Sequence, residues 1–108
     1  MSTPSTPDVV CVGESMILVT PTDAVLASAE SATLTLAGAE ANVTAGIVAA
    51  GHTAAWASRL GNDPLGERIT TELTRRGVEL WVEHDDEAPT GVMFKDPAAA
   101  GSSVYYYR

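Results

Sequence analysis

The sequence predicts an α/β fold, in which helices pack against a mainly parallel sheet. Three apolar runs, at residues 9–12, 53–60 and 78–82, have the composition of buried strands. Segments with helical character separate the second run from the first and from the third. Because parallel strands joined through helices form right-handed crossovers, this order predicts one layered parallel sheet.

The N-terminal part of the chain alternates extended and connecting segments. The continuous apolar run at 9–12 predicts a buried parallel strand, which ends at Gly13 and Glu14. Residues 16–19 continue as a second extended piece, and residues 21–31, which carry few large apolar side chains, are expected to form a surface connection. Residues 33–36 alternate Thr with Leu, which is typical of a half-exposed strand.

Two helices are expected. Residues 40–50 form the first, which ends at Gly51 and whose Ala and Gly content favours close packing against a sheet over high helix propensity. Asp63 can cap the second helix, Pro64 fits its first turn, and Gly77 ends it.

The C-terminal part has a different pattern. An acidic turn at residues 84–89 precedes two short extended runs, at 90–95 and 103–107, which are joined by a loop rich in Ala, Gly and Ser. This arrangement predicts a β-hairpin.

Composition limits the classes of function. The chain has 108 residues, enough for one small domain, and a formal charge of −8 from 14 acidic and 6 basic side chains. This balance argues against nucleic acid and anionic membrane surfaces as partners, although one or two local Arg residues can still bind a small anion. Cys11 is the only cysteine, so no internal disulfide is expected. Without a secretory signal or a long apolar run, the sequence favours a cytoplasmic protein.

One motif has the chemistry of a ligand site. Residues 37–44 read Ala-Gly-Ala-Glu-Ala-Asn-Val-Thr and lie between a strand and a helix. Gly38 lets the backbone approach a ligand closely, and the first N–H groups of the helix are free to face it. Asn42 offers donors and an acceptor to hydroxyls, so the motif suits a small polyol or sugar acid. The alternative is that Gly38 only makes a turn and Asn42 bonds local backbone.

The motif, followed at matching intervals by Gly51 and Gly61, resembles the N-terminal signature of the PfkB/ribokinase family of carbohydrate kinases. The family form is Gly-Gly-x-Pro-x-Asn-x-Ala, and Glu40 in place of Pro resembles the 2-keto-3-deoxygluconate kinase branch. The resemblance extends from Val9 to Arg108.

The resemblance implies a ribokinase-like fold with a β-lid, a small sheet that closes over the sugar. It places the α/β body at about 8–32 and 38–83 and the lid strands at about 33–37 and 90–108. It also implies a C-terminal half that carries the ATP site, the catalytic base and a Gly-Ala-Gly-Asp motif. These 108 residues contain no such motif, so the chain is interpreted as an N-terminal fragment whose longer parent uses ATP and Mg²⁺.

Further site residues follow from the resemblance. In 2-keto-3-deoxygluconate kinases a Tyr-x-Arg in the lid binds the acid end of the substrate, and Tyr106 and Arg108 match it. Strand alternation puts both on one face, and an Arg fork grips a carboxylate with two parallel hydrogen bonds. The alternative is an exposed aromatic strand that ends in a solvated Arg. Glu14 matches a polar position at the sugar pocket, with a structural hydrogen-bond role as its alternative. Met93 departs from the family, which often has a substrate-binding Tyr nearby.

The favoured function is therefore the acceptor-sugar half of an ATP-dependent sugar-acid kinase. Another sugar kinase of the family, such as a fructokinase, is the alternative in the same class. A non-catalytic binding or dimerisation module is the alternative outside it, because exposed lid strands can pair across a homodimer.

Overall fold

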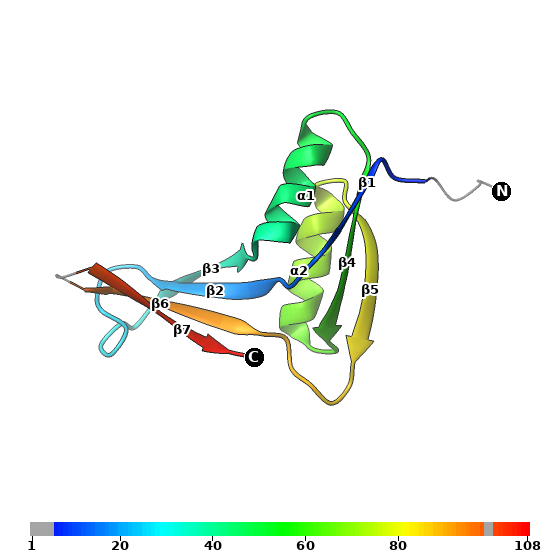
Figure 1. The fold of residues 1–108 in the computed structure, drawn as a ribbon. Coiled ribbons are helices and arrows are strands. Elements are labelled where there is room, and N and C mark those ends of the chain that lie inside the picture. Colours follow the sequence, from blue (N-terminus) through cyan, green and yellow to red (C-terminus); the bar gives the residue numbers. More distant parts are fainter. Residues whose placement is uncertain (1–5, 99–100) are drawn as a thin grey trace.

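The computed structural model describes residues 6–98 and 101–108 (Figure 1). Residues 1–5, and residues 99 and 100 in the expected hairpin loop, lie outside this description. The body sheet has the order β1-β4-β5, and its strands are β1 (Val9–Val12), β4 (Ala54–Gly61) and β5 (Glu79–Asp85). Both pairings are parallel, so the predicted parallel sheet is confirmed.

Two helices, α1 (Ala39–Ala49) and α2 (Pro64–Arg75), pack on the same face of this sheet (Figure 1). α2 buries Ile69 and Leu73 completely, as expected for an amphipathic helix. α1 buries only small side chains, which lets its backbone approach the sheet closely: Ala41, Thr44 and Ala45. Trp56 of β4 is fully buried in the core between the sheet and the helices.

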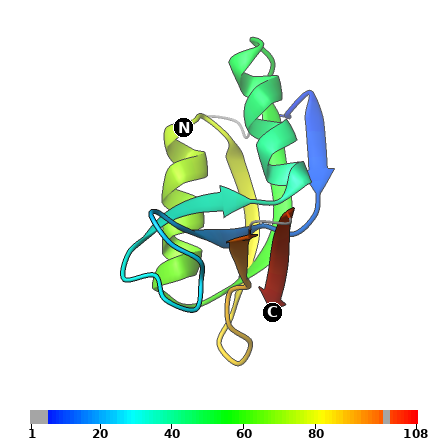
Figure 2. The same ribbon diagram turned by 90° about the vertical axis from the view of Figure 1, so that its left-hand side faces the viewer.

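The second sheet, which we call the lid sheet, has the order β3-β2-β6-β7. Its strands are β2 (Met16–Pro21), β3 (Ala32–Ala37), β6 (Val92–Ala98) and β7 (Gly101–Tyr107). The predicted hairpin is confirmed, because β6 and β7 pair antiparallel. The lid sheet projects to one side of the body in Figure 1, and in Figure 2 β3 crosses in front of α2 and ends at the start of α1.

The assignment of β2 differs from the expectation. Residues 8–32 were assigned to the body, whereas β2 lies in the middle of the lid sheet, antiparallel to β3 and parallel to β6. A short apolar run predicts an extended segment, but it carries no information about the sheet that the segment joins. Ile17 of β2 is fully buried and belongs to the body core, so this strand connects the two sheets.

The first strand is also less buried than expected. β1 is an edge strand, and Val9, Val10 and Val12 are 38%, 40% and 74% exposed. Val10 and Val12 alternate with Cys11, the partner of the buried Trp56, so they lie on the face away from the two helices (Figure 1), and Val9 lies at the start of this edge strand. Among the described residues, no helix is long and apolar enough to cross a membrane.

Candidate functional site

The turn at Gly38 is packed against the link between β1 and β2. Gly38 has a φ of 124°, and a Cβ at this position would overlap the carbonyl oxygen of Glu14. The buried Ser15 hydroxyl donates a hydrogen bond of 2.9 Å to the carbonyl of Ala37, on the other side of the same contact. The backbone of Glu14 is therefore held against the predicted sugar-binding turn.

Glu40, the glutamate of the motif, also packs against the link between β1 and β2. The side chain of Glu40, in the first turn of α1, lies against Gly13, where a Cβ would overlap it. The departure from the family's Pro thus has a packing consequence, because Glu40 fills the space that Gly13 leaves open.

Arg108 meets Glu14 across the boundary between lid and body. Its Nη1 donates to Oε1 of Glu14 at 2.7 Å, and its guanidinium carbon lies 5.1 Å from the centre of the Tyr106 ring. This cation–π contact shows that the side chain of Arg108, the residue after β7, lies on the same side of the lid sheet as Tyr106. The structure therefore brings together four of the predicted site residues: Glu14, Gly38, Tyr106 and Arg108.

The other face of β7 has a packing role. The ring of Tyr107 meets that of Phe94 edge to face, with centres 5.5 Å apart and an angle of 87° between the planes. Because Tyr107 and Tyr106 point to opposite faces, the first stiffens the hairpin while the second supports Arg108.

A hollow of about 730 Å³ lies between β7 and the start of α2. This volume is within the range of small-molecule sites. Its walls come from α2, from the segment that enters β6 and from the end of β7, and its lining residues are Asp63, Pro64, Leu65, Pro89, Thr90, Val92, Tyr106, Tyr107 and Arg108. The predicted acid-binding pair thus lines an open hollow of the molecular surface.

Asn42 is not grouped with these residues. It lies one turn into α1, is exposed, and lines a different hollow, of about 480 Å³, together with Arg76. Its backbone N–H bonds the carbonyl of Gly38, which is an ordinary helix hydrogen bond. Its contact with a sugar stays a prediction.

Met93 pairs directly with Tyr106 across the hairpin and with Leu18 of β2 on its other side. The face of the lid sheet that carries Tyr106 is therefore apolar at the position where the family often has a phenol. Met93 can contact the carbon skeleton of a ligand, but it cannot donate a hydrogen bond to it.

Asp63 caps α2, as predicted, and also bonds Thr90. Its Oδ1 accepts from the backbone N–H of Gly66 at 2.8 Å, and its Oδ2 accepts from that of Thr90 at 2.9 Å. Partial burial raises the pKa of Asp63, but hydrogen bonds from Thr90 and Gly66 outweigh this and hold the pKa below its ordinary value. The carboxylate is therefore a structural anion. Sequence reasoning missed Thr90, which has no signal beyond its place before Gly91.

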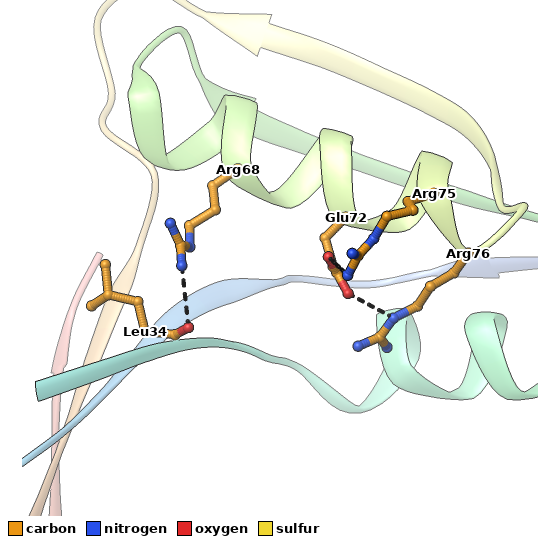
Figure 3. A network of polar contacts seen from close by, with 5 residues as sticks. All are labelled: Leu34, Arg68, Glu72, Arg75 and Arg76. Atoms are coloured by element: carbon orange, nitrogen blue, oxygen red, sulfur yellow. Dashed lines mark hydrogen bonds and ion pairs between the residues drawn. The ribbon is translucent and has the colours of Figure 1, made fainter. Parts of the chain in front are cut away.

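A second surface feature, which the sequence analysis did not identify, is a groove of about 560 Å³ between α2 and β3. Figure 3 shows its basic side: Glu72 accepts from Arg75 at 2.6 Å and from Arg76 at 3.1 Å, and Arg68 donates to the carbonyl of Leu34 at 3.4 Å. Hydrogen bonds from Arg75 and Arg76 hold the pKa of Glu72 below its ordinary value. None of the predicted site residues lines this groove.

Within residues 6–98 and 101–108 there is no group of three or more His, Cys, Asp or Glu side chains that could hold a metal ion.

The sequence of the chain is similar to those of known carbohydrate kinases. The family model for pfkB family carbohydrate kinase matches residues 6–108. The chain is 40% identical over 96 residues to a 2-dehydro-3-deoxygalactonokinase of Haloferax volcanii, covering 88% of this chain and 30% of that protein. It is 42% identical over 76 residues to a 2-dehydro-3-deoxygluconokinase of Bacillus subtilis, covering 68% of this chain and 24% of that protein.

Solved structures of similar proteins have the same fold. The PfkB protein of Polaromonas sp. superimposes with a TM-score of 0.87 and 34% identity over 95% of this chain and 35% of that one. A sugar kinase of Pyrococcus horikoshii in complex with ATP superimposes with a TM-score of 0.85 and 28% identity over 92% of this chain and 33% of that one. The chain thus spans about a third or less of the length of the proteins that it matches.

Proposed function

Because the chain belongs to the pfkB family of carbohydrate kinases, we propose that it supplies the acceptor half-site and the lid of a sugar-acid kinase. The activity of the longer protein is the ATP-dependent phosphorylation of a terminal hydroxyl of 2-keto-3-deoxygluconate, also called 2-dehydro-3-deoxygluconate, or of a related sugar acid. The similarity to 2-dehydro-3-deoxygluconokinase and 2-dehydro-3-deoxygalactonokinase supports this substrate class.

One observation carries the proposal. Arg108 lies against the ring of Tyr106, on the same face of the lid strand, and both line the hollow of about 730 Å³. A planar guanidinium supported by an aromatic ring is suited to grip a carboxylate with two parallel hydrogen bonds. A neutral sugar has no group that uses this arrangement fully, so the geometry favours an acid over the fructokinase-like alternative.

The roles of the individual residues follow from their places. Arg108 and the Tyr106 hydroxyl, which line the hollow, bind the acid end, and the family resemblance assigns the Gly38 turn a backbone contact with the sugar. Asn42 bonds a hydroxyl only if the acceptor extends along α1 toward it. The carboxylate of Asp63 accepts several hydrogen bonds within the fold, so it takes no proton from the substrate.

ATP and Mg²⁺ belong to the proposal only as requirements of the longer protein. ATP provides the phosphoryl group, and Mg²⁺ neutralises the charge that develops on it. The described residues offer no group of three or more metal-ligating side chains, and the sequence contains no Gly-Ala-Gly-Asp motif. A cytoplasmic location and a homodimer formed through the lid strands are further parts of the proposal.

A chimera tests the function. Residues 1–108 replace the matching part of the Bacillus subtilis 2-dehydro-3-deoxygluconokinase, and ATP-dependent phosphorylation of 2-keto-3-deoxygluconate is compared with that of fructose. We expect turnover of the acid in preference to the neutral sugar. Arg108→Ala should lower kcat/KM for the acid at least about tenfold, the loss expected for hydrogen bonds to a charged group. Arg108→Lys should recover only part, because an ammonium cannot present two parallel donors.

Lys95→Ala is the matched control, because Lys95 is another exposed cation of the lid sheet. It should leave the preference for the acid unchanged. If Arg108→Ala lowers activity toward acid and neutral sugar equally, Arg108 is a lid-folding residue. The sugar-acid assignment then fails and a fructokinase-like specificity replaces it.

A further inference from the structure

Only one nitrogen of the Arg108 guanidinium, Nη1, donates a hydrogen bond to the residues that the structure describes. Nη1 donates to Oε1 of Glu14 at 2.7 Å, and the ring of Tyr106 lies against the guanidinium. The Nε–Nη2 edge makes no hydrogen bond to any of the residues that the structure describes. Arg presents its donors in a planar fork, so this edge keeps two parallel N–H groups available for a carboxylate.

The backbone of Glu14, whose side chain binds Nη1, is packed tightly against its neighbours. Its carbonyl packs against Gly38, where no Cβ fits, and the next residue is anchored by the bond from Ser15 Oγ to the carbonyl of Ala37. Arg108, in contrast, comes from the end of a lid strand whose residues 101–107 are all exposed. The ion pair thus joins a residue at the end of the lid sheet to a residue in the link between β1 and β2, 94 residues apart in the chain.

We propose that Glu14 is a positioning residue for the acid end of the site. By holding Nη1, Glu14 orients the guanidinium against Tyr106 so that the Nε–Nη2 edge faces the acceptor's carboxylate. Arg108 then lies between two carboxylates, one from the protein and one from the sugar acid. This inference rests on the proposed function and gives Glu14 a role other than the direct sugar contact that the family resemblance implies.

The ion pair between Glu14 and Arg108 is exposed, and this exposure distinguishes a positioning role from a role in stabilising the fold. The side chains of Arg108 and Glu14 are 54% and 50% exposed. Ion pairs that are this exposed contribute little to stability, because water screens them. Removal of the Glu14 carboxylate should therefore leave the fold intact and change only what the guanidinium binds.

The test follows the side-chain Nε–H signal of Arg108 by NMR while the 108-residue chain is titrated with 2-keto-3-deoxygluconate or with fructose. In the unchanged chain, the acid should shift this signal and fructose should not. Glu14→Ala should weaken binding of the acid by up to about fivefold, the most that an exposed ion pair can contribute by orienting its partner. Glu14→Gln keeps an acceptor oxygen for Nη1 and should bind the acid within about twofold of the unchanged chain.

Two further variants complete the design. Glu30→Gln removes a negative charge from the exposed connection between β2 and β3 and should change nothing. Arg108→Ala should abolish the preference for the acid, and adding Glu14→Ala to it should cause no further loss, because the two residues act through one contact.

Specific results would overturn the inference. If Glu14→Ala binds the acid as the unchanged chain does, while Arg108→Ala does not, the positioning role is wrong and the proposed function stands. If Glu14→Ala and Glu14→Gln weaken the acid and fructose alike, Glu14 contacts the sugar itself. If the acid never shifts the Arg108 signal and Arg108→Ala has no effect on its binding, the proposed function fails together with the inference.

Discussion

Asp63 and Thr90 join the start of α2 to the segment that enters the lid sheet. The carboxylate accepts from both the backbone N–H and the hydroxyl of Thr90, at 2.9 and 2.7 Å, and it caps α2 through Gly66. The same hydroxyl oxygen accepts from the backbone N–H of Gly61 at 3.0 Å. These two side chains therefore fix the end of β4, the first turn of α2 and the base of the lid.

The first prediction is that Asp63→Ala lowers the free energy of unfolding by about 2–3 kcal/mol. This sum combines a lost helix cap with a Thr90 N–H that is left without its partner. Asp63→Asn, which keeps one acceptor oxygen, should lose less. Urea denaturation measures both, and Asp23→Ala, at an exposed site, is the control. An equal, small change in all three variants would contradict a linking role for Asp63.

The same contacts predict a pH dependence. The folded-state pKa of Asp63 is lower than its ordinary value: burial raises it, but the bonds from Thr90 and Gly66 outweigh burial. The stabilisation by Asp63 is therefore complete above the unfolded pKa of about 3.9, and it is lost as pH falls through the lower folded pKa. The stability difference between the unchanged chain and Asp63→Ala should be constant near neutral pH and shrink in acid. A difference that grows as pH falls would contradict the sign of the shift.

The body of the fold was predictable because its signals are local. Apolar runs located β1, β4 and β5, and the Asp63-Pro64 pair located the start of α2. The membership of β2 was not predictable, since its partner β6 pairs Ile17 with Val92, far along the chain. Strand pairings at such separations leave no trace in a local pattern of apolar residues.

The candidate site was predictable residue by residue but not as an arrangement. The family motif identified Gly38, and strand alternation placed Tyr106 and Arg108 on one face. No local rule joins Glu14 to Arg108, because their contact depends on how the lid sheet meets the body. Thr90 was missed for the same reason, and the exposure of β1 was missed because a strand's sequence does not report which of its faces is covered.

Another prediction concerns the stability of the Gly38 turn. Gly38→Ala should destabilise the chain by at least about 2 kcal/mol, since a Cβ is strained at a φ of 124° and would overlap the Glu14 carbonyl. Gly46→Ala is the matched control: Gly46 lies inside α1 with open space around it, so Ala should stabilise by about 0.5–1 kcal/mol. Thermal denaturation of the two variants should shift in opposite directions. If both shift upward, the tight contact at Gly38 is wrong.

A further prediction is that the 108-residue chain alone has no ATP-dependent kinase activity. Its sequence lacks the Gly-Ala-Gly-Asp motif to which the family resemblance assigns the catalytic base, so we expect no phosphoryl transfer. Coupled assays with several sugars and sugar acids check this. ATP-dependent turnover that survives repurification of the chain would contradict it.

The last prediction concerns the face of the body sheet opposite the two helices. Val12, Ala57 and Trp81 lie side by side across β1, β4 and β5, and Val12 and Trp81 are 74% and 49% exposed. An apolar row of this kind, next to the open edge of β1, favours association. The isolated chain should therefore self-associate as its concentration rises, which sedimentation velocity can measure. Replacing Val12 and Trp81 by Thr should reduce this association, whereas Val25→Thr, at an exposed Val in the connection after β2, should not. A compact monomer that unfolds cooperatively at high concentration, before any substitution, would show that this face does not drive association.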